Sequence, residues 1–267
     1  MKKRTVLTVA ALALLMSANA NAKMREVPVT YTVNGQTFEN ILVYDDAGRA
    51  DRPALLMVPD WLGINKDNIA KAKEIAGKDY VVMLADMYGK GVRPKTPDEA
   101  KAQTSAVYAK PLEHRARMNA ALESLRSQKI VKFNPAKIAA LGYCFGGKSV
   151  LELARSGASL AAVASFHGGL DTSLPAKEGQ VNTSIAIFNG AEDRGTEKDV
   201  MTVQNELRKA DADFMFVNFA GAVHCFALPH ANRDGCRYHP VAAERSERMM
   251  REFFAEKFNK IPQKMKP

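Results

Sequence analysis

The stretch Ile138-Ala-Ala-Leu-Gly-Tyr-Cys-Phe-Gly-Gly147 decides the fold. Its first four residues are apolar, which is typical of a short strand buried on both faces. Glycines two positions before and after Cys144 indicate a sharp strand-to-helix turn, with a nucleophile exposed at its tip. An apolar-periodic segment near 146–156 follows at once and predicts the required helix. Because Gly-x-Cys-x-Gly is a short motif, a buried structural cysteine is the alternative.

The position of Cys144 at the start of a predicted helix also has a chemical consequence. Unpaired backbone N–H groups at a helix start favour a thiolate over a thiol. The N–H of Phe145, the residue directly after the candidate nucleophile, is placed to bind a developing oxyanion. We therefore expect this turn to supply both a nucleophile and one oxyanion donor.

Strand-like and helix-like patterns alternate along the rest of the chain. Residues 27–33 alternate, Asn34-Gly35 indicates a tight turn, and residues 38–44 return, which together predict a hairpin. Short apolar runs predict buried strands, and apolar periodicity predicts helices between them: strands 54–58, 80–85, 138–141, 160–166, 185–188 and 214–219, and helices 69–76, 118–125, 146–156, 197–209 and 249–258. The order predicts an α/β fold with a mostly parallel central sheet flanked by helices on both faces, and the turn at Cys144 is typical of the α/β-hydrolase type of that fold.

One segment interrupts this alternation. Residues 86–110 contain Gly89, Gly91, Pro94 and Pro97 among charged residues, which favours a surface excursion bordering a pocket. The sequence leaves open whether this excursion acts as a lid.

The first 22 residues have the pattern of a signal peptide. Three cations at positions 2–4 precede an apolar run from Val6 to Met16, and Ala20-Asn21-Ala22 offers a cleavage site. The apolar run is too short for a membrane span, and no later stretch is long enough. We expect cleavage near Ala22, secretion, most simply to a bacterial periplasm, and a single α/β-hydrolase domain over residues 23–267.

The composition and the distribution of charge argue against a nucleic-acid partner. The formal charge of +9 over 267 residues falls to +6 without the signal peptide. Lys and Arg are scattered among Asp and Glu, without a basic run or interleaved aromatics, so we expect no nucleic-acid partner. The sequence gives no indication of the oligomeric state.

Two further motifs follow predicted strands at the places where a hydrolase needs them. Strand 185–188 leads into a loop with Glu192 and Asp193, and strand 214–219 leads into a loop with His224. Nucleophile, acid and histidine occur in this order in α/β-hydrolases. A solvated carboxylate and a loop histidine without a catalytic role are the alternatives for each residue taken singly. The ordered trio is what favours catalysis.

These motifs resemble the dienelactone hydrolase (carboxymethylenebutenolidase-like) family of α/β-hydrolases over nearly all of residues 23–267. Cys144 in Gly-Tyr-Cys-Phe-Gly-Gly matches the family's nucleophile, and His224 in His-Cys-Phe-Ala matches its histidine. Asp193 in Gly-Ala-Glu-Asp matches its acid, which favours it over Glu192. The resemblance implies a Cys-His-Asp triad.

The resemblance also covers the segment after the strand at 54–58. Residues 59–65, Pro-Asp-Trp-Leu-Gly-Ile-Asn, are similar to the family segment that carries an oxyanion donor, here the N–H of Trp61. Asp60 stands where the family commonly has a glutamate close to the resting thiol. The alternative is that Asp60 only caps the following loop.

Several positions depart from the family pattern for dienelactone. A family arginine four residues past the histidine is replaced by Leu228, and in residues 86–90 only Lys90 offers a charge where the family has a second arginine. Lysine lacks the planar fork that binds a carboxylate bidentately. His167 stands where a pocket-lining aromatic is expected, although a packed histidine at a strand end is the alternative. We therefore expect a neutral or weakly anionic ester or lactone as the substrate, and not dienelactone itself.

Residues 224–239 gather three of the five histidines and two of the three cysteines. A metal-binding loop is one interpretation, but the spacing matches no zinc pattern, and we predict no metal site. The second interpretation is a disulfide between Cys225 and Cys236, which an oxidising compartment allows. Accidental clustering is a third. A bond between Cys144 and Cys225 in a redox-locked inactive form is a minority hypothesis.

The function expected from these observations is the hydrolysis of an ester or lactone through a thioester at Cys144, with His224 as base and Asp193 as orienting acid. The expected partner is a small-molecule substrate, and the chemistry requires no metal or organic cofactor. The alternative is a binding or thiol-redox protein on a hydrolase scaffold, in which Cys144 carries out no ester chemistry.

Overall fold

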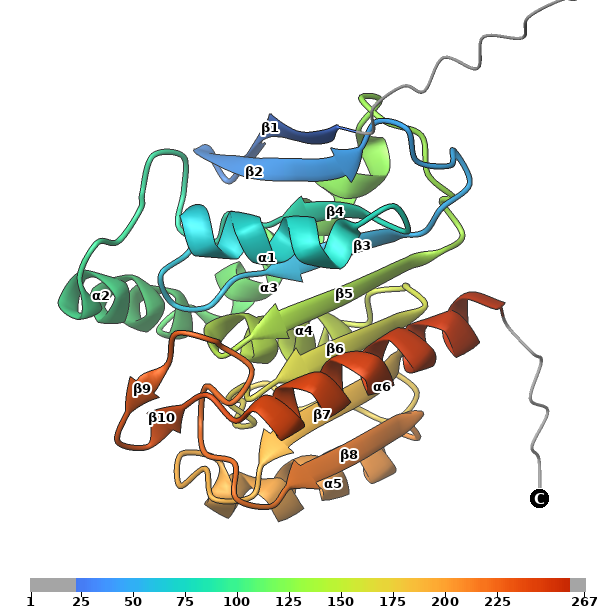
Figure 1. The fold of residues 1–267 in the computed structure, drawn as a ribbon. Coiled ribbons are helices and arrows are strands. Elements are labelled where there is room, and N and C mark those ends of the chain that lie inside the picture. The colour runs from blue at the N-terminus through green and yellow to red at the C-terminus, as the bar shows by residue number, and fades with distance from the viewer. Residues whose placement is uncertain (1–22, 260–267) are drawn as a thin grey trace, which may run out of the picture.

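The computed structural model describes residues 23–259 and contains an eight-stranded sheet (Figure 1). The strand order is β1-β2-β4-β3-β5-β6-β7-β8, in which β1 pairs antiparallel with β2 and β2 antiparallel with β4. All later neighbours pair parallel. The strands are β1 Met24–Val33, β2 Gln36–Asp45, β3 Ala54–Val58, β4 Val81–Leu84, β5 Ile138–Tyr143, β6 Ala162–Phe166, β7 Ser184–Gly190 and β8 Phe214–Phe219. The predicted mostly parallel sheet is confirmed.

Helices cover both faces of the sheet, as predicted (Figure 1). On one face lie α1 (Lys66–Ala76) and α6 (Pro240–Asn259), and on the other lie α3 (Pro111–Ser127), α4 (Phe145–Arg155) and α5 (Val200–Lys209). A short 3-10 helix, Glu197–Asp199, precedes α5. The small hairpin of β9 (Asn232–Arg233) and β10 (Cys236–Arg237) lies at the end of the sheet toward which β5, β6 and β7 point.

The central strands explain the continuous apolar runs in the sequence. Every residue of β3, β4, β5 and β6 is buried, because helices cover both sides of these strands. Neighbouring residues face opposite cores: Leu56 packs in the core with α3 and α4, whereas Leu55 packs in the core with α1 and α6. Strand direction and alternation therefore place the ends of β3, β5, β7 and β8 at one edge of the molecule.

Residues 86–110 differ from the expected irregular excursion because they contain a helix, α2 (Pro97–Tyr108). Thr96 caps it by accepting a hydrogen bond from the N–H of Glu99, and Pro97 occupies its first turn. Only three of its residues are buried, Ala100, Thr104 and Val107. Because its apolar stripe is this thin, hydrophobic periodicity gives no clear signal there.

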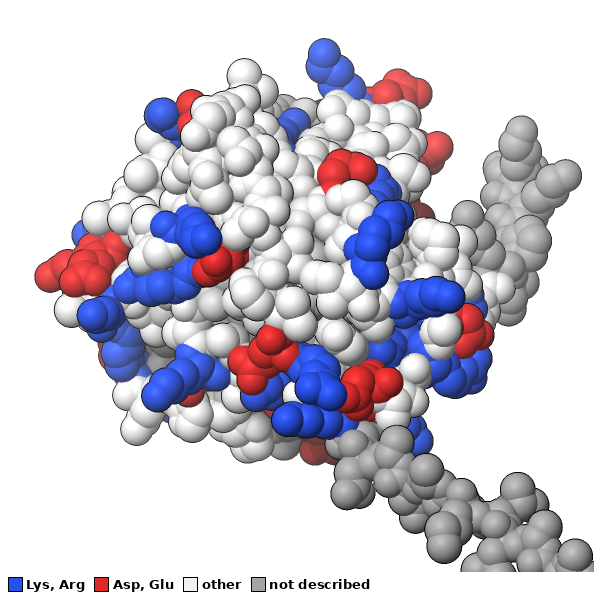
Figure 2. Space-filling view, turned by 90° about the horizontal axis from the view of Figure 1, so that it is seen from above, with Lys and Arg blue, Asp and Glu red and all other residues white. Residues whose placement is uncertain are grey.

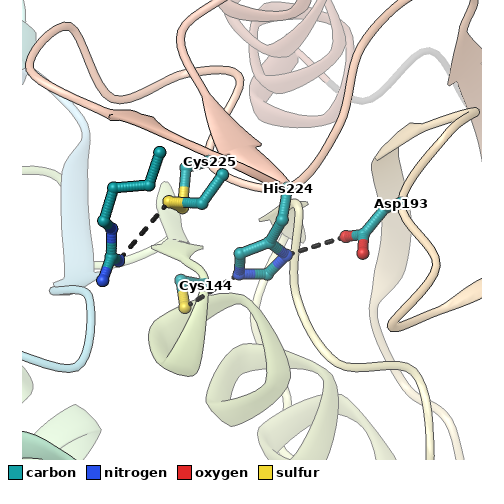
Figure 3. Close-up of a disulfide and its surroundings, with 6 residues drawn as sticks. Cys144, Asp193, His224 and Cys225 are labelled. Atoms are coloured by element: carbon teal, nitrogen blue, oxygen red, sulfur yellow. Dashed lines mark hydrogen bonds and ion pairs between the residues drawn. A yellow bond between two sulfur atoms is a disulfide. The ribbon is translucent and has the colours of Figure 1, made fainter.

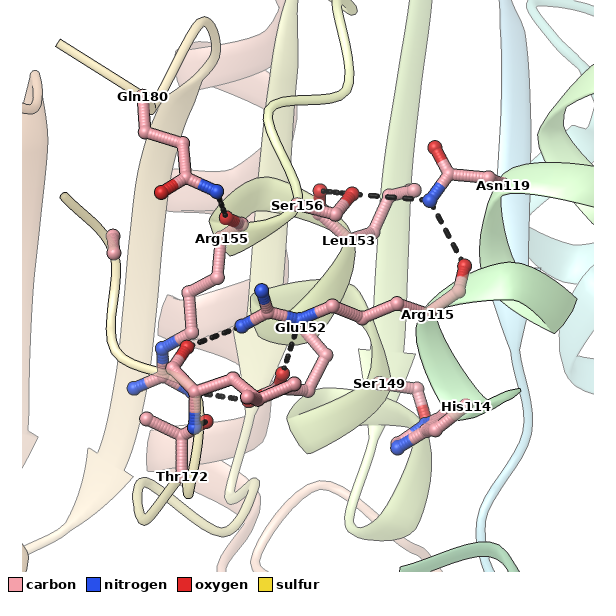
Figure 4. A network of polar contacts seen from close by, with 12 residues as sticks. His114, Arg115, Asn119, Ser149, Glu152, Leu153, Arg155, Ser156, Thr172 and Gln180 are labelled. Carbon is pink, nitrogen blue, oxygen red and sulfur yellow. Dashed lines mark hydrogen bonds and ion pairs between the residues drawn. The ribbon is translucent and has the colours of Figure 1, made fainter. Parts of the chain in front are cut away.

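Helix α4, which begins directly after Cys144, is tied to its neighbours by a buried polar network (Figure 4). Glu152 accepts hydrogen bonds from Arg115 of α3 at 2.8 Å and from Arg155 at 3.0 Å. Arg155, only 1% exposed, also binds Glu206 of α5. Removing one partner of such a buried pair typically costs about 3–5 kcal/mol. The network therefore holds the helix that carries the candidate nucleophile.

The surface carries charges of both signs. On the face shown in Figure 2, basic and acidic side chains are interspersed, as expected of a solvated surface. Within residues 23–259, none of the helices combines the length and apolar character needed to cross a bilayer. The predicted signal peptide, residues 1–22, lies outside the described residues and stays a prediction.

Candidate active site

The turn at Cys144 has the strained geometry expected of an exposed nucleophile. Between the end of β5 and the start of α4, Cys144 adopts φ 52° and ψ −112°, a conformation that residues other than glycine rarely adopt. A Cβ on Gly142 would lie 2.1 Å from the carbonyl oxygen of Gly146, and one on Gly146 would lie 2.1 Å from that of Val58. The two flanking glycines are therefore a steric requirement of this turn.

The structure brings the three predicted residues together (Figure 3). His224 lies in the loop after β8, with Nε2 3.1 Å from Cys144 Sγ and Nδ1 2.7 Å from Asp193 Oδ2. Asp193 lies in the loop after β7, is 5% exposed, and accepts a second hydrogen bond from the N–H of Gly195 at 2.9 Å. Glu192 points to solvent instead. The geometry thus selects Asp193 over Glu192 as the partner of the histidine.

The charge of His224 is set by opposing effects. Burial lowers its pKa, but the hydrogen bonds to Asp193 and Cys144 outweigh burial and raise the pKa to about 10. His224 is therefore protonated near neutral pH. A protonated imidazole donates from both ring nitrogens, here to the Asp193 carboxylate and toward Cys144 Sγ.

His167 packs against His224 in the core and does not line an open pocket. Its side chain is fully buried, and its ring contacts that of His224 edge-on, with the centroids 5.2 Å apart. The ring of Phe226 lies at the same centroid distance on another side. Neither ring nitrogen of His167 has a hydrogen-bond partner among residues 23–259, and burial lowers its pKa well below the usual value. His167 is thus a neutral ring beneath His224, as the alternative interpretation holds.

The segment after β3 lies beside the start of α4, as the position of Gly146 against Val58 shows. It contains Trp61, whose carbonyl oxygen accepts a hydrogen bond from the hydroxyl of Tyr88 at 2.8 Å. Within the described residues, no acceptor is recorded for the backbone N–H of Trp61 or of Phe145. The role of both amides as oxyanion donors stays a prediction.

Asp60 has the contacts of a loop cap. Its Oδ1 accepts hydrogen bonds from the N–H of Leu62 at 2.9 Å and from the side chain of Asn68 at 3.3 Å. Burial raises the pKa of Asp60. The capping interpretation thus accounts for the residue without a contact to the thiol.

A cavity of about 430 Å³ lies beside these residues, between the Trp61 segment, the start of α1 and the loop after His224. Its wall includes Leu228, as expected, together with Trp61, Leu62, Ala227 and Pro229. A larger cavity of about 890 Å³ lies at the opposite edge of the sheet, where β5 and β7 begin. In α/β sheets ligands bind at the carboxyl ends of the strands, which favours the smaller cavity.

Lys90 is not among the residues that line this cavity. Its ammonium group lies 3.3 Å from the carboxylate of Glu39 on β2, so its charge is engaged there. The expectation that Lys90 borders the substrate pocket is not supported by this placement.

Two tyrosines that the sequence did not single out border the turn. The rings of Tyr88 and Tyr108 lie 5.4 and 5.6 Å from that of Phe145, measured between centroids. Tyr108 is the last residue of α2, so recognising the Thr96-Pro97 helix start would have placed it.

Cys225 and Cys236 form a disulfide, and Cys144 is a half-buried free thiol. Since Cys225 is bonded to Cys236, it forms no bond with Cys144 in this structure. Both thiols that a metal-binding loop would use are consumed by the bridge. Among the described residues there is no cluster of three or more His, Cys, Asp or Glu able to hold a metal ion.

Comparison with known proteins gives one family match and several similar proteins. Residues 40–258 match the model of the dienelactone hydrolase family. A solved structure named m3DLH is 32% identical, with a TM-score of 0.80 over 87% of this chain and 98% of that one. A dienelactone hydrolase-like promiscuous phosphotriesterase from metagenomic libraries is 29% identical, with the same TM-score and coverage. An uncharacterized protein of Caenorhabditis elegans is 33% identical over 149 residues, which are 53% of this chain and 92% of that protein.

Proposed function

The chain belongs to the dienelactone hydrolase family, and on this premise we propose that it is a cysteine hydrolase that opens carboxylic esters or lactones. One observation carries the proposal: the ring of His224 hydrogen-bonds Asp193 at 2.7 Å and lies 3.1 Å from the thiol of Cys144. A nucleophile, a base and a group that orients the base are thereby joined in one line.

In the proposed reaction, the Cys144 thiolate attacks the carbonyl carbon, and the carbonyl electron pair moves onto oxygen. The N–H groups of Trp61 and Phe145 bind that oxyanion, and each such donor is typically worth about 3–4 kcal/mol of transition-state stabilisation. As the carbonyl re-forms, the bond to the leaving oxygen breaks, and His224 donates its Nε2 proton to that oxygen. A thioester at Cys144 and an alcohol result.

Water then releases the acid. Neutral His224 takes a proton from the water, whose oxygen attacks the thioester, and the second oxyanion occupies the same two N–H groups. Collapse of this intermediate expels the Cys144 thiolate and restores the imidazolium. Throughout, Asp193 holds the Nδ1 proton of His224 and stabilises its charged form.

The cavity next to Tyr143 and Cys225, the chain neighbours of Cys144 and His224, supports a substrate without a strong negative charge. Its wall combines apolar side chains with carboxylates: Trp61, Leu62 and Leu228 with Asp60, Asp67 and Glu74. Lys71, which also lines it, is held by the carboxylates of Glu74 and Glu247 at 3.0 and 2.9 Å. Arg233 lies over the ring of Trp61, 5.6 Å from its centroid, and supplies one cation at the edge of the cavity. This set lacks the paired arginines of a carboxylate clamp, so we do not propose dienelactone itself.

The test is hydrolysis of short-chain aryl esters and small lactones by the wild type and by Cys144→Ala, each with a monothiol reductant present and absent. We expect turnover by the wild type and a loss of at least 10³-fold in the alanine variant, because removing a nucleophile leaves only binding and the oxyanion donors. Equal rates in the two proteins would refute Cys144 as the nucleophile. An inactive wild type with a reactive thiol would favour the binding or thiol-redox alternative.

We also propose export, with residues 1–22 as a cleaved signal peptide. The support is the sequence pattern of three cations at positions 2–4, an apolar run from Val6 to Met16 and the small residues Ala20-Asn21-Ala22. The measurement is the intact mass of the protein recovered from the periplasm of a bacterial host. A mature protein that retains Met1 would overturn the proposal.

A further inference from the structure

We propose that the Cys225–Cys236 disulfide is a positioning element for His224, so that the site requires one reduced cysteine and one oxidised pair in the same chain. The inference rests on the proposed function for its effect on turnover. Its effect on the thiol of Cys144 can be measured without any substrate.

The bridge joins two chain segments that hold the backbone of His224. Cys225 directly follows the histidine, and Cys236 lies 11 positions later on β10 (Figure 3). His224 itself forms an isolated parallel bridge with Cys236, and its carbonyl oxygen accepts a hydrogen bond from the N–H of Arg237 at 3.0 Å. The covalent link therefore lies within one residue of the histidine on one side and on its paired residue on the other.

The backbone around His224 needs such a constraint. Cys225 has φ 63°, in the left-handed region that side chains other than glycine, asparagine and aspartate seldom occupy. Strained conformations of this kind persist where surrounding contacts determine them. His224 thus lies in an irregular loop that regular secondary structure does not hold.

Apart from the bridge, the loop is held by the fully buried ring of Phe226 and by backbone hydrogen bonds from Arg237 and His239, whereas its outer end is weakly held. The β9–β10 hairpin pairs only two residues from each strand, and Asn232 and Arg233 are exposed. A two-stranded hairpin of this size is marginal without further support. The bridge supplies that support and extends it to the oxyanion segment, because Arg233 contacts Cys236 Sγ at 3.7 Å and lies over the ring of Trp61.

Reduction of the Cys225–Cys236 disulfide should therefore inactivate the site without modifying Cys144. A small dithiol transfers two electrons and two protons, the bond between the two sulfurs breaks, and thiols form at Cys225 and Cys236 while the dithiol closes to its own disulfide. The loop is then free to leave the left-handed conformation at Cys225. His224 moves with it and loses its contacts with Cys144 and Asp193.

The experiment uses the full mature chain carrying Cys225→Ser and Cys236→Ser together, in which Cys144 is the single cysteine. The rate of Cys144 alkylation by iodoacetamide is measured from pH 5 to 10, because it reports the thiolate that the histidine maintains. In the wild type, alkylation at Cys144 is followed by peptide mass. We expect the double variant to react about tenfold more slowly near pH 6, equivalent to a displacement of its profile by about one pH unit. Ester turnover should fall mainly in kcat.

A matched control separates positioning from general stability. Phe254→Leu, in the buried side of α6, also lowers the melting temperature but should leave the alkylation profile unchanged. A folded double variant with the wild-type profile would overturn the proposal and make the bridge a structural link only. If the double variant does not fold, the same profile is measured on wild type incubated with a dithiol, where an unchanged profile has the same meaning. A displaced profile in a protein that hydrolyses no ester would sustain the positioning role and refute the proposed function.

Discussion

Replacing Asp193 with asparagine should disable the site while preserving its shape. Asp193 Oδ1 accepts a hydrogen bond from the N–H of Gly195 at 2.9 Å, so the oxygen of the new amide is retained there. The amide NH₂ then faces Nδ1 of His224, where Oδ2 accepts at 2.7 Å in the wild type. A donor at this place forces the histidine to keep its proton on Nε2. It can then neither carry the positive charge nor accept a proton from the thiol of Cys144.

The magnitude follows from the burial of this pair. Asp193 is 5% exposed, so loss of its charge leaves the imidazolium without its compensating partner. Changing the acid of a catalytic triad to its amide imposes the wrong histidine tautomer and typically lowers kcat by up to about 10⁴-fold. We therefore expect kcat to fall about 10²- to 10⁴-fold. KM should change little, because Asp193 touches the histidine and not the cavity.

The assay is steady-state hydrolysis of an aryl ester, together with the alkylation profile of Cys144. In the Asp193→Asn protein the pKa of His224 should fall from its raised value of about 10, so the profile should move toward that of an ordinary thiol. Glu192→Gln is the matched control, since this neighbouring carboxylate is exposed. A loss below tenfold in Asp193→Asn, or an equal loss in both variants, would refute the assignment of Asp193.

Three further predictions follow from packing and charge. Gly146→Ala should lower the melting temperature sharply or prevent folding, because its Cβ would meet the backbone of Val58, and thermal unfolding checks this. His167→Phe should make the free energy of unfolding less dependent on pH. Because the pKa of His167 is depressed in the folded protein, only the unfolded state binds a proton below about pH 6.5, and wild-type stability falls as the pH drops below that value. Denaturant unfolding at pH 5 and 7 should therefore show a smaller difference in the variant than in the wild type. Leu228→Arg should raise kcat/KM for esters with a free carboxylate relative to neutral esters, since it adds a cation to the cavity wall, and an unchanged ratio would contradict the proposed role of this cavity.

A redox requirement of this kind is compatible with an exported protein. A compartment oxidising enough to maintain the bridge at Cys225 also threatens a free thiolate at Cys144. Of the two sulfur sites, the bridge adjoins the cavity wall, whereas Cys144 is half-buried under His224.

The limits of sequence reasoning are clearest at the loops. Glu192 and Asp193 are adjacent carboxylates, and their order relative to Cys144 favours neither on chemical grounds. The structure separates them because the chain after β7 turns Asp193 inward, to 5% exposure, and Glu192 outward. In the same way, Lys90 has the right charge for a pocket, but its position opposite Glu39 on β2 engages it elsewhere.

The sequence by itself determined where the buried strands lie along the chain, which candidate catalytic residue follows each of them, and the turn at Cys144. Short apolar runs indicate strands that are buried on both faces. Gly142 and Gly146 permit a tight turn at positions where any side chain would clash with the backbone. Both signals are local, since they depend on composition and sterics. The ordered motifs predicted the trio of Cys144, Asp193 and His224, but only the tertiary structure set the distances between these groups and placed His167 against them. The contacts of His224 with Cys144, Asp193 and His167 join loops that lie 31 to 80 residues apart, and their distances depend on how the sheet and helices pack. Contacts between side chains that are this far apart in the sequence produce no periodic pattern along the chain. For this physical reason, the geometry of the site could not be obtained from the sequence alone.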